Sequence, residues 1–212
     1  MVVFPPASMV NFQSGVRQME KLRREFYARD TLTVARALLG NYVVRVWNGE
    51  KLICRITETE AYIGRCDKAC HAYGYKRTAR TETLFAQPGT AYIYLIYGMY
   101  NCLNFVTEAE EEPAAVLIRG LEVVSGAETI KQLRYPKITG ELTAYQRKNF
   151  LNGPGKLCKG LSLDRSLNGT DLTGDTLYVI RSGELPERIY TGPRIGIDYA
   201  EEAVHFPWRF WI

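Results

Sequence analysis

Long apolar runs are missing from this sequence. Nowhere do roughly 18 consecutive residues stay apolar, the length that a membrane-spanning helix requires. The first residues also lack the basic patch and apolar core of a secretion signal. Because of these absences, we do not expect a membrane protein. We expect a soluble cytoplasmic protein without membrane contact, associated with the nucleoid if the cell is bacterial and nuclear if it is eukaryotic.

A secreted disulfide framework is also missing, because the cysteines are odd in number and scattered, so we expect a reducing compartment. Cys66, Cys70 and His71 approach a zinc motif, but the second pair of ligands that a tetrahedral zinc site requires is absent. We therefore predict no metal and no other cofactor. A metal-dependent hydrolase built on these three residues is the less favoured alternative, and zinc bound to the purified protein would favour it. The cysteines occupy positions 54, 66, 70, 102 and 158.

A strong excess of one charge is lacking as well. The net charge of +4 in 212 residues is compatible with a polyanionic partner, but it is short of the charge of a nucleic-acid coat protein. Hydrophobic residues make up 46% of the chain, which is enough to form a full core. We predict one folded domain over residues 26–212, preceded by a lead-in over residues 1–25 that contains Pro5 and Pro6.

What is present is a mixture of strand and helix signals. Asn48-Gly49 is a strong two-residue hairpin signal between two β-forming segments, and Pro88-Gly89 introduces a third. The spacing of apolar residues predicts a helix over residues 32–39, ended by Gly40. The same reasoning predicts strands over residues 42–47, 52–59, 90–97, 114–119, 177–180 and 194–197, and helices over residues 122–133 and after the turn at 153–156.

The most informative segment runs from Thr57 to Asn104. It combines a carboxylate at Glu60, a histidine at His71 and a group of tyrosines. Because buried rings with polar tips need hydrogen-bond partners, this cluster favours a pocket for a flat ligand. Beside apolar rings, Glu60 would have a raised pKa and would suit a general base for water, whereas an ordinary solvated strand residue is the alternative. The tyrosines are Tyr62, Tyr92, Tyr94, Tyr97 and Tyr100.

Basic residues lie within the same segment, at Lys76, Arg77 and Arg80. Aromatic rings interleaved with basic side chains are what a protein needs to stack a nucleobase and hold its phosphates. An enzyme acting on a base inside a duplex must also flip that base out and fill the gap, which suits a tyrosine at a hairpin tip. A non-enzymatic damaged-DNA or RNA-binding module is the alternative, and it would not need Glu60.

Several blocks of sequence, in one order, carry a further signal. They are E-T-E-A-Y at 58–62, His71, P-G-T at 88–90, Y-I-Y-L-I-Y-G-M-Y at 92–100, L-I-R-G-L-E at 117–122, G-P-G-K-L-C at 153–158 and R-I-G-I at 194–197. From about Phe26 to Phe210, the chain resembles the alkyladenine DNA glycosylases, also called 3-methyladenine or methylpurine-DNA glycosylases. The resemblance implies an α+β fold, with a single compact domain, a curved and mostly antiparallel β-sheet, surrounding helices and a protruding β-hairpin that inserts into DNA.

The resemblance also implies roles for individual residues. Glu60 would activate the attacking water, which Arg119 and the backbone of Ile195 would hold beside it. Tyr97 would be the wedge that replaces the flipped base, and Asn104 would disfavour guanine because the guanine amino group would crowd its side chain. The walls that contact the flipped base would be Tyr62, His71 and Tyr94, and weaker groove or phosphate contacts would come from Met99, Arg134 and Lys156.

The implied activity is that of a monofunctional DNA glycosylase of base excision repair, acting as a monomer on double-stranded DNA. Its substrates would be the damaged purines 3-methyladenine, 7-methylguanine, hypoxanthine and ethenoadenine. Breaking the N-glycosidic bond develops positive charge on the sugar, which a nearby carboxylate stabilises while it deprotonates water. Because the resemblance places no lysine beside the base to form a Schiff base, the expected product is an intact abasic site.

Overall fold

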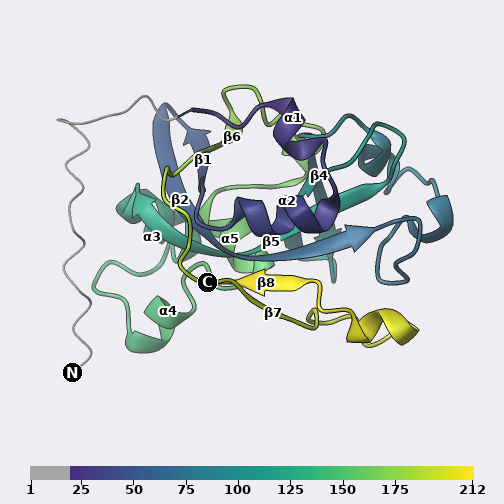
Figure 1. The fold of residues 1–212 in the computed structure, drawn as a ribbon. Coiled ribbons are helices and arrows are strands. Elements are labelled where there is room, and N and C mark those ends of the chain that lie inside the picture. The colour runs from purple at the N-terminus through teal and green to yellow at the C-terminus, as the bar shows by residue number, and fades with distance from the viewer. Residues whose placement is uncertain (1–19) are drawn as a thin grey trace.

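The computed structural model describes residues 20–212 of the chain (Figure 1). The predicted lead-in therefore lies outside the described residues as far as residue 19. Its remaining part contacts the folded body, because Lys21 forms an isolated bridge with Ile180 and Leu22 is buried in the main core.

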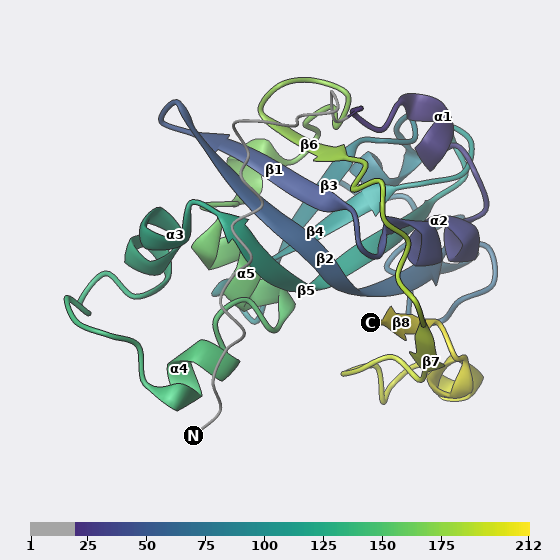
Figure 2. The same cartoon turned by 60° about the vertical axis from the view of Figure 1, so that its left-hand side comes forward.

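A large antiparallel sheet organises the described chain and curves as it twists (Figure 2). The Asn48-Gly49 turn joins its first two strands, and both turn residues have positive φ, as a two-residue hairpin requires. The strand order is β3-β4-β5-β2-β1-β6, and β7 pairs with β8, which adds to β2. The strands are β1 (Tyr42–Trp47), β2 (Glu50–Ile63), β3 (Ala91–Ile96), β4 (Tyr100–Val106), β5 (Ala114–Ser125), β6 (Leu177–Ile180), β7 (Tyr190–Gly192) and β8 (Arg209–Trp211).

The sheet divides along β2. The first part of this strand pairs with β1, whereas Glu58, Thr59 and Glu60 pair with β8 on the same edge, and β5 runs along the other edge. The register between β2 and β5 is irregular here, because Glu58 pairs with Gly120 while Thr59 pairs with Ile118. Such a bulge bends a strand and redirects its side chains. It falls where the strand carries the two glutamates.

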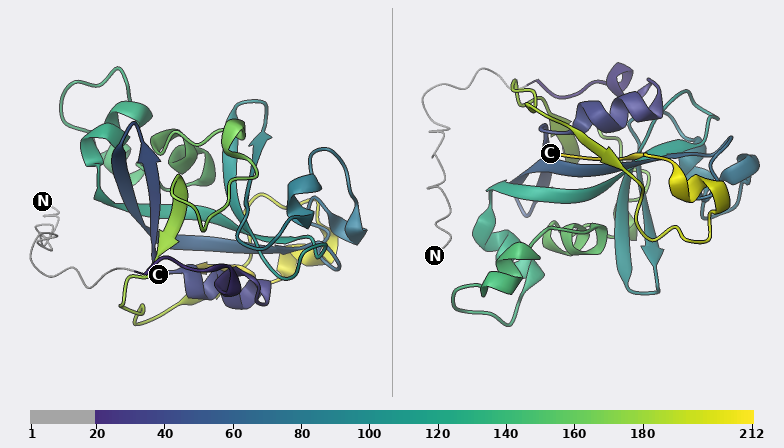
Figure 3. Two further views of the ribbon diagram at one scale, coloured as in Figure 1. Left: turned by 90° about the horizontal axis from the view of Figure 1, so that it is seen from above. Right: turned by 60° about the horizontal axis from the view of Figure 1, so that its bottom comes forward.

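Helices cover both faces of the sheet (Figure 3). On one face α2 packs against β2, and the Thr59 hydroxyl donates a hydrogen bond to the backbone oxygen of Ala35. On the other face α5 packs against β4 and β5. Within residues 20–212, none of the helices combines the length and apolar character needed to cross a membrane. The α-helices are α1 (Arg24–Tyr27), α2 (Thr31–Leu38), α3 (Ala127–Arg134), α4 (Ala144–Lys148) and α5 (Pro154–Gly160).

The β3–β4 hairpin extends beyond the rest of the sheet (Figure 3). Its tip is a tight turn in which Met99 N donates to Ile96 O, and Tyr97 and Gly98 both have positive φ. The hairpin rests against α5, because a Cβ atom on Gly155 would lie only 3.0 Å from the Tyr100 side chain. The predicted α+β class, with one compact domain and a mostly antiparallel sheet, is confirmed.

Two predicted elements are wrong. Residues 122–125 belong to β5 and not to a helix, because they pair with β2, and the helix begins only after Gly126, whose φ is 82°. Residues 194–197 form a loop and not a strand. Gly196 has a φ of 76°, which breaks an extended conformation, and the Arg194 side chain is held in a buried ion pair with Asp67.

Candidate active site

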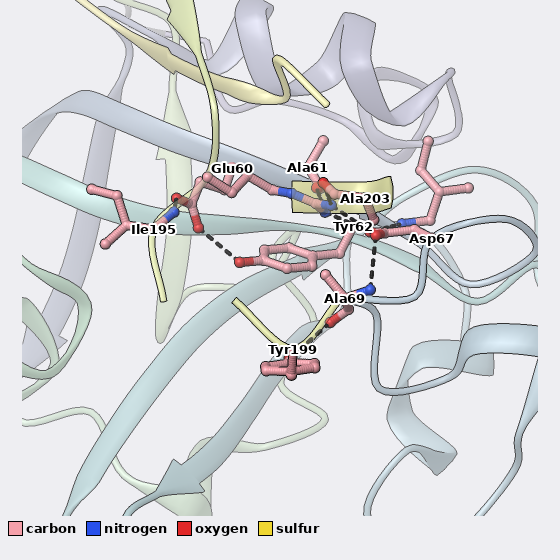
Figure 4. A network of polar contacts seen from close by, with 10 residues as sticks. Glu60, Ala61, Tyr62, Asp67, Ala69, Ile195, Tyr199 and Ala203 are labelled. Atoms are coloured by element: carbon pink, nitrogen blue, oxygen red, sulfur yellow. Dashed lines mark hydrogen bonds and ion pairs between the residues drawn. The ribbon is translucent and has the colours of Figure 1, made fainter. Parts of the chain in front are cut away.

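Glu60 is a fully buried carboxylate in β2. The Tyr62 hydroxyl donates to its Oε2 over 2.7 Å, and the backbone N–H of Ile195 donates to its Oε1 over 2.8 Å (Figure 4). Arg119, from β5, places Nη1 at 3.3 Å from Oε2. Because every one of these groups is a donor, the site suits the ionised form of the carboxylate.

Burial nevertheless raises the pKa of Glu60 above its ordinary value. Desolvation of the charged form has a larger effect than the charge of Arg119, the two hydrogen bonds and the charge of the more distant Arg194, all of which lower the pKa. Burial, followed by the charge of Glu60, raises the pKa of Tyr62 well above the usual value, so the phenol remains a hydrogen-bond donor. A carboxylate that is ionised yet poorly solvated is a stronger base than one in water.

An aromatic cavity of about 600 Å³ lies in front of this carboxylate. Its rings are closely arranged: His71 and Tyr94 meet edge to face with centroids 4.6 Å apart, and Tyr92 and Tyr94 are 5.2 Å apart. Glu60 itself lies directly behind the wall, which includes its three hydrogen-bonding partners. The polar and aromatic residues of the wall are Tyr62, His71, Arg80, Tyr92, Tyr94, Tyr97, Asn104, Arg119, Asp198 and Tyr199, together with Ile195.

Asn104 is fixed at the floor of the cavity, in β4. Its side-chain Nδ2 donates to the backbone oxygens of Tyr92 and Cys102 over 3.0 and 3.3 Å. Because both amide protons are engaged, the side chain cannot move aside without losing hydrogen bonds that are buried. The cavity wall therefore includes a buried polar group whose position is fixed.

Arg80 determines the tautomer of His71, whereas the sequence suggested only that Arg80 would hold phosphates. Arg80 Nη2 lies 3.4 Å from His71 Nε2, and arginine has no acceptor, so Nε2 must accept. The proton is then on Nδ1, which donates to the Tyr92 hydroxyl over 3.1 Å. Burial, with a smaller contribution from the Arg80 charge, lowers the pKa of His71 to about 4. His71 thus offers a neutral ring to the cavity.

This neutrality is testable by NMR, because the chain has only two histidines and a His205→Gln variant identifies the signals of His71. We expect the ring of His71 to show no titration between about pH 5 and 8, with the proton on Nδ1 throughout. A midpoint near the ordinary value of about 6.5 would contradict this assignment.

Tyr97 occupies the tip of the β3–β4 hairpin with 79% of its surface exposed. Its φ of 52° lies in the left-handed region, which costs a residue with a side chain roughly 1–2 kcal/mol relative to glycine. Met99, next to it, is 66% exposed. The tip thus presents two large apolar side chains to solvent on a strained turn, and packing within the described chain does not account for them.

The structure brings most of the predicted site residues to this cavity, but not all. Arg134 on α3 donates from Nε to the backbone oxygen of Phe150, and Lys156 on α5 donates to the Asn149 side chain. Neither residue lines the cavity, and neither does Met99. They lie on α3, α5 and the hairpin; α5 and the hairpin contribute residues to the cavity wall, whereas α3 contributes none. Those at the cavity are Glu60, Tyr62, His71, Tyr94, Tyr97, Asn104, Arg119 and Ile195.

The buried Asp67–Arg194 pair was also missed in the sequence. Arg194 Nη2 lies 2.7 Å from Asp67 Oδ1, and the guanidinium also donates to the backbone oxygens of Ala61 and Ala203. Figure 4 shows Asp67 and Ala203 beside the Glu60 contacts. The pair ties the loop that carries Ile195 to the end of β2, and so it keeps the Ile195 N–H at Glu60.

Cys66, Cys70 and His71, which approach a zinc motif in the sequence, are not gathered into one group of ligands. Cys66 is exposed while Cys70 is buried, and all five cysteines are free. Nowhere in residues 20–212 do three or more of the histidine, cysteine, aspartate and glutamate side chains gather closely enough to hold a metal ion.

Known proteins share the sequence of this chain over most of its length. The family described as methylpurine-DNA glycosylase matches residues 25–212. The chain belongs to the methylpurine-DNA glycosylase family. Two relatives are each named "Putative 3-methyladenine DNA glycosylase". The one from Clostridium perfringens strain SM101 is 53% identical over 195 residues, covering 91% of this chain and 95% of that protein. The one from Desulfitobacterium hafniense strain Y51 is 50% identical over 194 residues, covering 92% and 96%.

The resemblance found in the sequence is thereby confirmed. As a methylpurine-DNA glycosylase, the protein is a DNA repair enzyme whose macromolecular partner is DNA.

Proposed function

We propose that this DNA glycosylase flips a damaged purine from duplex DNA into the aromatic cavity and hydrolyses its N-glycosidic bond with a water activated by Glu60. The observation that carries the proposal is the buried carboxylate of Glu60, contacted only by donors and lying directly behind the wall of a cavity made of rings. A flat base fits between such rings, and its sugar then faces the carboxylate.

The water would enter between Glu60 and the groups that now touch it, Arg119 and the Ile195 backbone. Its oxygen forms a bond to C1′ of the sugar while Glu60 accepts its proton, and the C1′–N9 electron pair leaves with the purine. The negative carboxylate also stabilises the positive charge that develops on the sugar. Arg119 keeps the carboxylate ionised until the water arrives.

Base selection would depend on the cavity walls. Tyr62, His71 and Tyr94 stack on or hydrogen-bond the purine, and Asn104 crowds the exocyclic amino group of guanine. Neutral lesions such as hypoxanthine and ethenoadenine lack that group and are accepted. 3-Methyladenine and 7-methylguanine carry positive charge, so their glycosidic bonds break readily even where the fit is imperfect.

Tyr97 would fill the space that the flipped base leaves. Since base–aromatic stacking contributes about 1–3 kcal/mol, Tyr97→Ala is expected to slow base release from duplex DNA roughly 10- to 100-fold. Single-stranded substrate has no gap to fill, so there the loss is expected to be much smaller. Single-turnover rates on both substrates measure the difference. Leu185→Ala, which truncates a side chain that is 93% exposed elsewhere, is the control. Equal losses on both substrates would contradict the wedge.

The protein would contact duplex DNA as a monomer, with Met99, Arg134 and Lys156 along the backbone and grooves. The abasic product would stay intact, because a strand-cleaving glycosylase uses an amine to form a Schiff base, and among the described residues none that lines the cavity is a lysine.

The test of this function is single-turnover base release from duplexes that contain one hypoxanthine, one ethenoadenine or only normal bases. We expect free hypoxanthine and ethenoadenine, no release of normal guanine, and strand breaks only after alkali treatment. Strand cleavage without alkali would overturn the monofunctional mechanism. A protein that binds lesion duplexes but releases no base from them or from methylated DNA would be a binding module instead.

A further inference from the structure

A row of alternating charges leads from β8 to Glu60. Arg209 Nη1 lies 3.1 Å from Glu58 Oε1, and Arg119 Nε lies 3.5 Å from the same Glu58 oxygen. Arg119 then reaches Glu60 with Nη1 at 3.3 Å. Glu58 and Glu60 share one face of β2, and Arg209 is the register partner of Glu60 in β8. Arg119 therefore lies between two carboxylates, of which Glu60 alone adjoins the cavity.

The bulge in β5 gives Arg119 this position. Gly120 pairs with Glu58 and Ile118 pairs with Thr59, so Arg119 is the extra residue and opposes no residue of β2. A side chain at Gly120 would crowd β2, because a Cβ atom at this position would lie 2.8 Å from Thr57 Oγ1 and 3.0 Å from the Cβ atom of Glu58. Strand pairing thus brings Glu58 against Arg119.

Arg119 is held more loosely than its burial suggests. Its side chain is only 13% exposed, yet its Nε has no hydrogen-bond partner within the described chain, and its contacts with both glutamates exceed 3.2 Å. Charges this poorly solvated interact strongly over several ångströms. The two carboxylates therefore compete for one guanidinium.

Glu58 and Arg209 have no contact with the aromatic cavity. Both line a second cavity of about 510 Å³ on the other side of Arg119, and the two cavities share no lining residue. Glu58 can therefore influence the reaction through Arg119, through Arg209 or at a distance through its charge. Arg209 has one further route, because its Nε donates to the backbone oxygen of Pro193, in the loop that carries Ile195.

We propose that Glu58 and Arg209 are positioning residues for base release: they fix where Arg119 lies between the two carboxylates and so set the proton affinity of Glu60. This inference rests on the proposed role of Glu60 as the base. Glu58 draws Arg119 away from Glu60, and Arg209 offsets that attraction by neutralising Glu58. The alternative is a purely structural role, in which the Glu58–Arg209 ion pair only holds β8 against β2.

Other charged or titratable groups face Glu60 as well. They come from β2, from β4, from β5 and from the loop before β8. Unlike Glu58, these groups line the cavity or hold its loop in place, so replacing them would alter the site itself. Arg209 also contacts that loop through Pro193, which is why the charge-conserving Arg209→Lys variant accompanies Arg209→Gln. These groups are Tyr62, Cys102, Arg119 and Arg194, the last paired with Asp67.

The experiment is the pH dependence of single-turnover ethenoadenine release in wild type, Glu58→Gln, Arg209→Gln and the double variant. Release needs ionised Glu60, so the rate falls at acid pH with a midpoint that reports its pKa. Removing the negative charge of Glu58 is expected to lower that midpoint, and removing the positive charge of Arg209 to raise it, each by roughly half a pH unit or more. The double variant, which loses a neutral pair, is expected to return close to wild type.

Opposite movements of the midpoint separate this role from a structural one, which would leave the midpoint unchanged or shift it in one direction for both variants. Either of those results overturns the inference. Thermal unfolding checks that each variant is folded, and Arg209→Lys, which keeps the charge, is expected to retain the wild-type midpoint even if a glutamine variant is unstable. If the wild-type rate does not fall at acid pH, or if Glu60→Gln keeps wild-type activity, the proposed function fails. If wild type and Glu60→Gln behave as expected but the midpoints of the Glu58 and Arg209 variants equal that of wild type, only this inference fails.

Discussion

Glu60→Gln is expected to lose base release almost completely while still folding and binding lesion DNA. Glutamine has nearly the same shape, but it neither accepts the proton of water nor offers negative charge to the developing sugar cation. General-base catalysis and electrostatic stabilisation are each worth two or more powers of ten, so the single-turnover rate is expected to fall roughly 10³-fold or more. Rates on an ethenoadenine duplex and the dissociation constant for the same duplex measure the two effects separately.

The matched control is Glu122→Gln, the same chemical change at an exposed glutamate of β5. It is expected to release base at the wild-type rate. A Glu60→Gln rate within tenfold of wild type would contradict the role of Glu60 as general base, and loss of DNA binding together with activity would show that the substitution had disturbed the site.

Asp67→Asn is expected to destabilise the protein by about 3–5 kcal/mol, the cost of leaving one partner of a buried ion pair unpaired. Asp67 and Arg194 have fully buried side chains, and Asp67 also accepts from the backbone N–H groups of Ile63 and Ala69. Asparagine keeps the shape but removes the negative charge that balances Arg194. The free energy of unfolding in urea, compared between the variant and wild type, measures the loss.

Asp175→Asn is the control for this prediction, because Asp175 forms an ion pair with Lys21 at the surface, where its side chain is 96% exposed. Its unfolding midpoint is expected to stay close to that of wild type, since solvent screens such pairs. If Asp67→Asn were no more destabilising than Asp175→Asn, the pair would not anchor the loop that carries Ile195.

Local patterns predicted the parts of the fold whose signals lie within a few residues. The Asn48-Gly49 hairpin and the helix before Gly40 were found because turn geometry and apolar spacing are local properties. The segment at 194–197 was misread because its apolar residues suggest a strand. Its true conformation depends on Asp67, which lies 127 residues away. The helix expected to start at residue 122 failed for the same reason, because β2 pairs with residues 122–125.

The candidate site was predictable to a similar extent. Tyrosines that alternate along a strand share one face, so the ring cluster followed from the spacing of Tyr92 and Tyr94. The partners of Glu60 did not follow from local spacing, because Arg119 lies 59 residues and Ile195 135 residues along the chain, and only the resemblance to a family pointed to them. The bulge that places Arg119 between two glutamates has no signature in the sequence, because it arises from the register of two strands.

The measurement that tests the central claim most directly is the pH dependence of ethenoadenine release by wild type and Glu60→Gln, corrected for uncatalysed loss of the base. Burial raises the pKa of Glu60, and only the ionised form accepts the proton of water. The wild-type rate is therefore expected to rise tenfold per pH unit to a plateau, with a midpoint above the ordinary glutamate value of about 4.3. The residual rate of Glu60→Gln is expected not to show this rise with pH. A wild-type rate that is flat across this range, or an acid limb that survives in Glu60→Gln, would show that another group activates the water.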